Sequence, residues 1–324
     1  MHYICAVVVV LVLLAVTIFI HLKLKKPFVD HPFVDPFMGY MWSDWRLADE
    51  NGGDMTDSNC APQYVRLPPI LSNVNCLKNG DILYCESTES QKLLSILDDL
   101  SVHIILITGR YHIPSFVVQN PLCICENKYI VRWFAQNPIC KHPKITPIPY
   151  GLKPDSIPTF VKVFSSGMKN RTEEVLHVGL LDNYPLRCNI SPIPPPRTQL
   201  ISSQDSRTSL DMFYKRMARA KCVISPCGDR CDCYRHVEAI LLGCVPITAL
   251  PPEYDELYKD VTINVSESEL ANCARDRTIP YGSTLPQITD NKRERFTKAY
   301  WEQHIIGLRK RIKETTLVDF VLTL

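Results

Sequence analysis

The sequence has almost no surplus of charge of either sign. Its 36 Lys and Arg residues face 34 Asp and Glu residues, for a formal net charge of +2. A dedicated nucleic-acid-binding protein usually carries a basic surplus, so we expect no nucleic-acid partner. Glycine is also scarce, with 12 Gly against 25 Pro in 324 residues, which indicates loops stiffened by fixed φ angles. An apolar fraction of 46% excludes wholesale disorder, and the length allows one large domain or two of about 100–150 residues.

Charge, proline and glycine are all missing from residues 4–20. With His21 and Leu22 this segment approaches the roughly 20 residues that a membrane-spanning helix needs. A helix packed on a protein core would show a polar stripe, and this segment shows none. A cleaved signal peptide would need a basic start and a small-residue cleavage site, and the sequence has neither. We therefore predict a short tail over 1–3 and an uncleaved transmembrane signal anchor over 4–22. This anchor would hold the protein in the membrane.

The orientation of this anchor is open to two interpretations. Three lysines follow the span: Lys23, Lys25 and Lys26. Taken alone they predict a cytosolic C-terminal domain, and thus a membrane-tethered α/β protein that faces the cytosol. The 14 cysteines and three N-glycosylation sequons, which begin at Asn170, Asn189 and Asn264, favour an oxidising lumen with disulfide bonds. We favour the lumenal orientation, which is type II and single-pass.

Beyond the anchor the pattern divides the chain into a stem and two halves. Residues 27–36 hold two near-copies of Pro-Phe-Val-Asp, and proline there predicts an extended stem over 23–60. Strand-like and helix-like segments then alternate, as in the apolar run at 102–108, which indicates an α/β architecture. We expect an N-terminal half over 61–165 and a C-terminal half over 166–324, with a ligand in the cleft between them. A basic amphipathic helix over 291–313 is expected to pack across both halves.

The segment at 222–248 carries the most chemical information. It reads as a strand, a Pro-Cys-Gly loop, a helix over 232–242, a glycine turn and a second strand. A helix N-terminus after such a loop suits a phosphate, and Gly228 lets the backbone approach it. Arg235 could grip a diphosphate with two hydrogen bonds, and Glu238, three residues on, could accept hydrogen bonds from ribose hydroxyls. The same two residues could instead form a surface ion pair.

The cysteines of this loop raise the question of a metal. Cys227, Cys231 and Cys233 together with His236 would supply four zinc ligands on paper. The single residue between Cys231 and Cys233 is unusual for a structural zinc site. We therefore predict no metal ligands here.

This segment resembles the donor-binding block of the exostosin-like glycosyltransferases. The matching residues are Ser225, Pro226, Gly228, Arg235, Glu238, Ala239, Gly243, Cys244, Val245, Pro246 and Ile247, and segments 133–137 and 142–152 match more loosely. The resemblance implies a GT-B fold, with two Rossmann-like halves that face a cleft. It implies a nucleotide-sugar donor on the C-terminal half, held by Ser225, Gly228, Arg235 and Glu238, and acceptor contacts on the N-terminal half. It also implies a type II protein of the Golgi or ER membrane with a lumenal catalytic domain.

The expected activity is transfer of a sugar from a nucleotide sugar to a glycan or glycoprotein, with inversion. Such a transfer needs a base that takes the proton of the acceptor hydroxyl, and the candidate is His112, which follows a predicted strand end. Arg110 is a candidate contact to the acceptor or the diphosphate. No Asp-x-Asp stands at a strand end, so we expect no divalent metal and no tightly bound cofactor besides the nucleotide sugar as co-substrate. The alternative is a non-catalytic, lectin-like protein or pseudoenzyme of the same fold.

Overall fold

The computed structural model describes residues 31–47, 68–86, 89–109, 121–167, 170–177, 209–228 and 230–314. The predicted anchor at 4–22 and the candidates Arg110, His112 and Asn189 lie outside these ranges. The chain divides into residues 1–31 and a compact unit of residues 32–324. Within the described ranges, no helix is both long enough and apolar enough to cross a bilayer.

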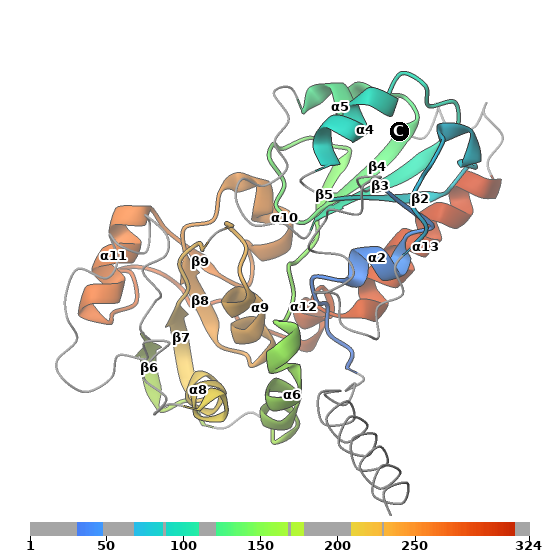
Figure 1. The fold of residues 1–324 in the computed structure, drawn as a ribbon. Coiled ribbons are helices and arrows are strands. Elements are labelled where there is room, and N and C mark those ends of the chain that lie inside the picture. Colours follow the sequence, from blue (N-terminus) through green and yellow to red (C-terminus); the bar gives the residue numbers. More distant parts are fainter. Residues whose placement is uncertain are drawn as a thin grey trace, which may run out of the picture. The chain divides into compact units, whose positions relative to one another are not determined.

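The compact unit contains two sheets whose described strands are all parallel (Figure 1). The first sheet has the order β1 (Trp45–Leu47), β2 (Ile82–Glu86), β3 (Ile104–Gly109), β4 (Ile130–Ala135), β5 (Ile145–Pro147). The second has the order β6 (Glu173–Leu176), β7 (Ala220–Ile224), β8 (Val245–Thr248), β9 (Ile263–Asn264). The predicted α/β class is confirmed. Both orders run in sequence, so the described strands contain no reversal of the kind that marks a Rossmann switch point.

The first sheet is covered on both faces, which explains why its central strands are apolar throughout. Every residue of β2 and β3 is buried. Alternate side chains divide between two clusters: Leu83 and Leu106 lie in one, Tyr84 and Ile107 in the other. The first cluster includes residues of α4 (Ser90–Ile96) and α5 (Leu122–Glu126), and the second includes residues of α2 (Met38–Trp42) and α13 (Lys298–Glu314). Parallel strands normally need such cover on both sides.

The second sheet follows the same rule. Its two sides fall in different clusters, with α8 (Leu210–Met217), α9 (Tyr234–Leu241) and α10 (Asp255–Tyr258) on one side and α11 (Glu267–Asp276) on the other. Helix α6 (Ile157–Ser165) packs on α8 through Phe160 and Tyr214, whose ring centroids are 5.2 Å apart. Among the described residues, the remaining elements are α12 (Asp290–Glu294) and three short 3-10 turns, η1 (Val74–Cys76), η3 (Pro154–Ser156) and η4 (Pro252–Tyr254).

The structure differs from the predicted stem over 23–60. Residues 32–47 of that segment belong to the fold, because they form α2 and the edge strand β1. The amide of Val34 donates to the carbonyl of Phe296 at 3.0 Å. The amide of Leu152 donates to the carbonyl of Val34 at 2.8 Å. Gly151 has φ +87°, and a Cβ there would lie 2.2 Å from the Val34 carbonyl oxygen, so only glycine allows this contact. Proline disfavours a helix here, but the side chains of Phe33, Val34 and Phe37 are buried in the core.

The basic C-terminal region also differs in detail from the helix predicted over 291–313. It is two helices, α12 and α13, separated by residues 295–297. Arg295 forms an ion pair with Asp260, before β9, whereas Arg309 forms one with Asp44, before β1, at 2.9 Å. The region therefore contacts segments beside both sheets, as the sequence predicted.

Candidate functional site

The loop between β7 and α9 has the predicted strand, loop, helix, glycine and strand order. The amide of Ser225 donates to the carbonyl of Ile247 at 2.9 Å, which extends the pairing of β7 with β8. Helix α9 begins at Tyr234, two residues later than predicted, and Cys233 is its N-cap. Gly243 ends the turn with φ +72°, a left-handed conformation that glycine adopts without steric cost.

Arg235 lies in the first turn of α9, and Glu238 lies three residues further along the same helix. The Glu238 side chain is 6% exposed, and its Oε1 accepts a hydrogen bond of 2.6 Å from the hydroxyl of Tyr214 on α8. Burial raises the pKa of Glu238, while the Tyr214 hydrogen bond and the positive charge of Arg235 oppose that rise. Among the described residues, no hydrogen-bond donor reaches the second oxygen, Oε2. Glu238 is thus a buried carboxylate held in place at one oxygen, with a half-buried guanidinium nearby.

The amide of Gly228 forms a hydrogen bond within the loop. Its amide donates to the carbonyl of Arg230 at 2.8 Å, within the loop itself. That N–H is therefore engaged in a turn, and the donor contact that the resemblance implies for Gly228 stays a prediction.

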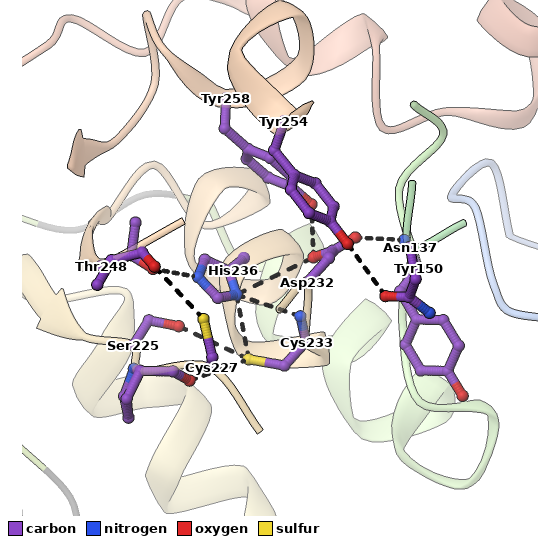
Figure 2. A network of polar contacts seen from close by, with 12 residues as sticks. Asn137, Tyr150, Ser225, Cys227, Asp232, Cys233, His236, Thr248, Tyr254 and Tyr258 are labelled. Atoms are coloured by element: carbon purple, nitrogen blue, oxygen red, sulfur yellow. Dashed lines mark hydrogen bonds and ion pairs between the residues drawn. The ribbon is translucent and has the colours of Figure 1, made fainter. Parts of the chain in front are cut away.

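Asp232 fastens this loop to two other segments (Figure 2). It is 1% exposed; Oδ2 accepts the amide of Tyr150 at 2.6 Å, and Oδ1 accepts the hydroxyl of Tyr258 on α10 at 2.7 Å. The guanidinium of Arg230 lies 3.4 Å from the centre of the Tyr150 ring. Burial raises the pKa of Asp232. Since these contacts fix the loop on both sides, the residues that follow it on α9 are held in a defined position.

His236 is the other buried polar residue of this region (Figure 2). Its Nε2 lies 2.7 Å from Thr248 Oγ1 and its Nδ1 lies 3.1 Å from Cys233 Sγ. Nowhere in the described ranges do three or more His, Cys, Asp or Glu side chains gather in an arrangement that could hold a metal ion.

No disulfide joins any two of the eleven cysteines that the structure describes. Two pairs lie within hydrogen-bonding reach: Cys125 with Cys140, and Cys227 with Cys231. The expected disulfide bonds therefore remain a prediction.

Asn137 is a candidate ligand residue that the sequence gave no reason to single out by itself. It follows β4, at the carboxyl end of the first sheet, and its φ of +64° is uncommon for a residue other than glycine. Its side chain is 4% exposed, and Oδ1 accepts a hydrogen bond from the Tyr254 hydroxyl at 3.2 Å. The side-chain nitrogen Nδ2 is buried and has no hydrogen-bond partner among the residues that the structure describes. Buried amides are nearly always paired, and strained residues gather at functional sites, so we count Asn137 as a site residue.

The structure thus brings Ser225, Arg235 and Glu238 to one loop and helix. It describes neither His112 nor Arg110. Tyr214, Tyr150 and Asp232 are the supporting residues that the sequence missed, because their partners lie 24 to 82 positions away along the chain.

The described sequons differ in how their asparagines are engaged. Asn170 is exposed. The Asn264 amide is exposed too, but it donates to the carbonyl of Leu250 and accepts from the amide of Leu250, both at 2.7 Å. A glycan on Nδ2 of Asn264 would disturb this pair of hydrogen bonds.

We therefore expect glycosylation at Asn170 rather than at Asn264. In secretory cells, Asn170→Gln should remove an endoglycosidase-sensitive mobility shift, and Asn264→Gln should leave that shift unchanged. Asn272→Gln, at an exposed asparagine outside any sequon, is the matched control. A shift that disappears only in Asn264→Gln would contradict the expectation, and a chain without any glycan would favour the cytosolic orientation.

No family model matches the chain, and no curated protein matches it either.

Proposed function

We propose that the protein is a membrane-anchored, inverting glycosyltransferase that takes a sugar from a nucleotide sugar and transfers it to a glycan or glycoprotein. The observation that carries the proposal is the joint position of Arg235 and Glu238 after the carboxyl end of β7. In parallel α/β sheets, ligands bind at the carboxyl ends of the strands. The GT-B arrangement of the two sheets, the anchor at 4–22 and the lumenal Golgi or ER location belong to the same proposal.

The chemistry of these two side chains suits the two charged and polar parts of a nucleotide sugar. A guanidinium can donate two parallel hydrogen bonds to a diphosphate, which carries the negative charge that develops on the leaving group. A carboxylate can accept hydrogen bonds from ribose hydroxyls. Tyr214 occupies only Oε1 of Glu238, which leaves Oε2 for the ribose.

The first sheet would supply the acceptor side. The Nδ2 group of Asn137 is a donor suited to an acceptor hydroxyl. His112 remains the candidate for the base that takes the acceptor proton. Arg110 remains a candidate contact to the acceptor or the diphosphate.

A ligand panel tests this proposal. The full-length chain in detergent micelles is mixed with nucleotide sugars of different bases and sugars, and the apparent melting temperature is measured. A ligand at 100 times its Kd stabilises the folded state by about 2.7 kcal/mol. We expect one donor class to raise the melting temperature and to give a glycosylated product by mass spectrometry. Binding without transfer would support the lectin-like or pseudoenzyme alternative, and a panel without any stabilising member would refute the proposal.

The raised pKa of Glu238 gives donor binding a pH dependence. If ribose hydroxyls donate to the ionised carboxylate, affinity should rise as the pH rises through a pKa that lies above the usual glutamate value. Titrations of the full-length chain between pH 4.5 and 7.5 measure this rise. Glu238→Gln should lose the dependence, and Glu269→Gln, at an exposed glutamate of α11, should keep it. Equal pH profiles in the native chain and in Glu238→Gln would contradict the assigned role.

A further inference from the structure

Cys233 and His236 form a pair that the proposed sugar transfer does not use. The distance from Cys233 Sγ to His236 Nδ1 is 3.1 Å, and the backbone amide of Cys233 also donates to Nδ1 at 3.3 Å. The other ring nitrogen, Nε2, lies 2.7 Å from Thr248 Oγ1. His236 is fully buried, so its ring is held between β8 and the start of α9 with Nδ1 directed at the sulfur (Figure 2).

The position of the sulfur in the fold favours its ionised form. Cys233 is the N-cap of α9, an eight-residue helix, and the N-terminus of a helix stabilises negative charge. Cys233 is only half-buried, whereas Cys222, Cys227 and Cys244 are buried. A thiol beside an imidazole at a helix N-terminus is the usual environment of a reactive cysteine.

The charged and titratable groups around this sulfur come from several elements. His236 and Arg235 on α9 favour the thiolate and Asp232 opposes it, while Tyr258 on α10 and Cys227 in the loop also face the sulfur. Burial works against the charge, but the imidazole outweighs it and lowers the pKa of Cys233 to about 7. Burial likewise opposes a charge on His236, but the Cys233 sulfur raises the pKa of His236 above its usual value.

We propose that Cys233 is a nucleophilic thiol that His236 activates, and that it is a site of covalent modification by small, uncharged, soft electrophiles. In the activated pair, His236 Nδ1 takes the thiol proton and gives up the hydrogen bond that it accepts from the Cys233 amide, and the thiolate attacks the electrophilic carbon. With iodoacetamide a sulfur–carbon bond forms, the carbon–iodine bond breaks and iodide leaves. The reagent must be small because Cys233 is only partly exposed and its sulfur lies within 4 Å of Ser225 Oγ and the Pro226 carbonyl.

Modification at this position has a consequence for the neighbouring site. An added group on Cys233 would lie two residues before Arg235, at the start of the helix that carries Glu238. We therefore expect alkylation to block donor binding. This consequence rests on the proposed function, whereas the reactivity of the thiol does not.

The test is alkylation of the full-length chain in detergent micelles by iodoacetamide, without nucleotide, followed by mass spectrometry of each cysteine between pH 5.5 and 9. At pH 7 we expect Cys233 to react about tenfold faster than Cys76, a half-buried cysteine without this setting, because more of it is thiolate. The rate at Cys233 should rise with a midpoint near pH 7. A midpoint at or above the ordinary thiol value of about 8.5 would overturn the proposal, as would a native chain in which Cys76 reacts and Cys233 does not.

Two variants separate activation by His236 from mere exposure. His236→Gln retains an amide that can reach Thr248 but lacks Nδ1, so the rate at Cys233 should fall about tenfold at pH 7. Cys231→Ser is the matched control in the same loop and should leave the Cys233 rate unchanged. If His236→Gln does not fold, as its melting curve would show, the pH profile of the native chain decides alone. An unchanged rate in folded His236→Gln, or faster reaction at Cys231 than at Cys233, contradicts the proposal.

Discussion

Arg235→Ala is expected to weaken nucleotide-sugar binding about tenfold to a hundredfold, because hydrogen bonds to charged groups contribute about 1.5–3 kcal/mol. The loss should be as large for the nucleoside diphosphate alone, since the guanidinium is assigned to the diphosphate and not to the sugar. Isothermal titration of the full-length variant with both ligands measures the two losses. The fold should survive, because Arg235 is half-buried and its hydrogen bond to the Ile224 carbonyl is long, at 3.5 Å.

Arg275→Ala is the matched control for this variant. Arg275 lies on α11, is half exposed, and pairs with Asp276. Its removal takes away the same charge without touching the loop after β7, so donor binding should be unchanged. Equal losses in the two variants would mean that net charge, and not a contact from Arg235, governs binding.

Asp232→Ala is expected to have the largest effect on stability. It leaves two buried donors, the amide of Tyr150 and the hydroxyl of Tyr258, without an acceptor. Each orphaned donor costs about 1–3 kcal/mol, so the variant with its two orphaned donors should lose about 2–6 kcal/mol of unfolding free energy. The apparent melting temperature of the full-length chain, followed by tryptophan fluorescence, should fall by several degrees.

Asp276→Ala provides the comparison for this loss, since Asp276 is 53% exposed and pairs only with a neighbouring arginine among the described residues. Surface substitutions of this kind change stability by about 0.5 kcal/mol or less. A melting temperature of Asp232→Ala that equals that of Asp276→Ala would show that Asp232 does not fasten the loop.

The parts of the fold that the sequence predicted are those with a local cause. The α/β class followed from apolar runs of strand length, such as 102–108, which corresponds to β3 (Ile104–Gly109). Gly243 was recognisable as a turn because a left-handed residue after a helix favours glycine. These signals depend on neighbours within a few residues, so a single sequence contains them.

The parts that the sequence missed have distant partners. Strand β1 is only three residues long, and it exists because Trp45 pairs beside Leu83 of β2, far along the chain. Asp232 is the first residue of the helix predicted over 232–242, but in the structure it precedes α9, and Tyr150 and Tyr258 donate hydrogen bonds to its two oxygens. The hydrogen bond from Tyr214 to Glu238 connects helix α8 to helix α9. No spacing pattern in the sequence predicts a contact between two separate helices.

Hydrogen exchange with and without a nucleoside diphosphate is the measurement that tests the central assignment most directly. The full-length chain in detergent micelles is compared alone, with the nucleoside, and with the nucleoside diphosphate. We predict that the diphosphate slows exchange in peptides covering residues 225–241 and that the nucleoside alone does so much less. Protection confined to other parts of the chain, or no protection at saturating diphosphate, would contradict the account.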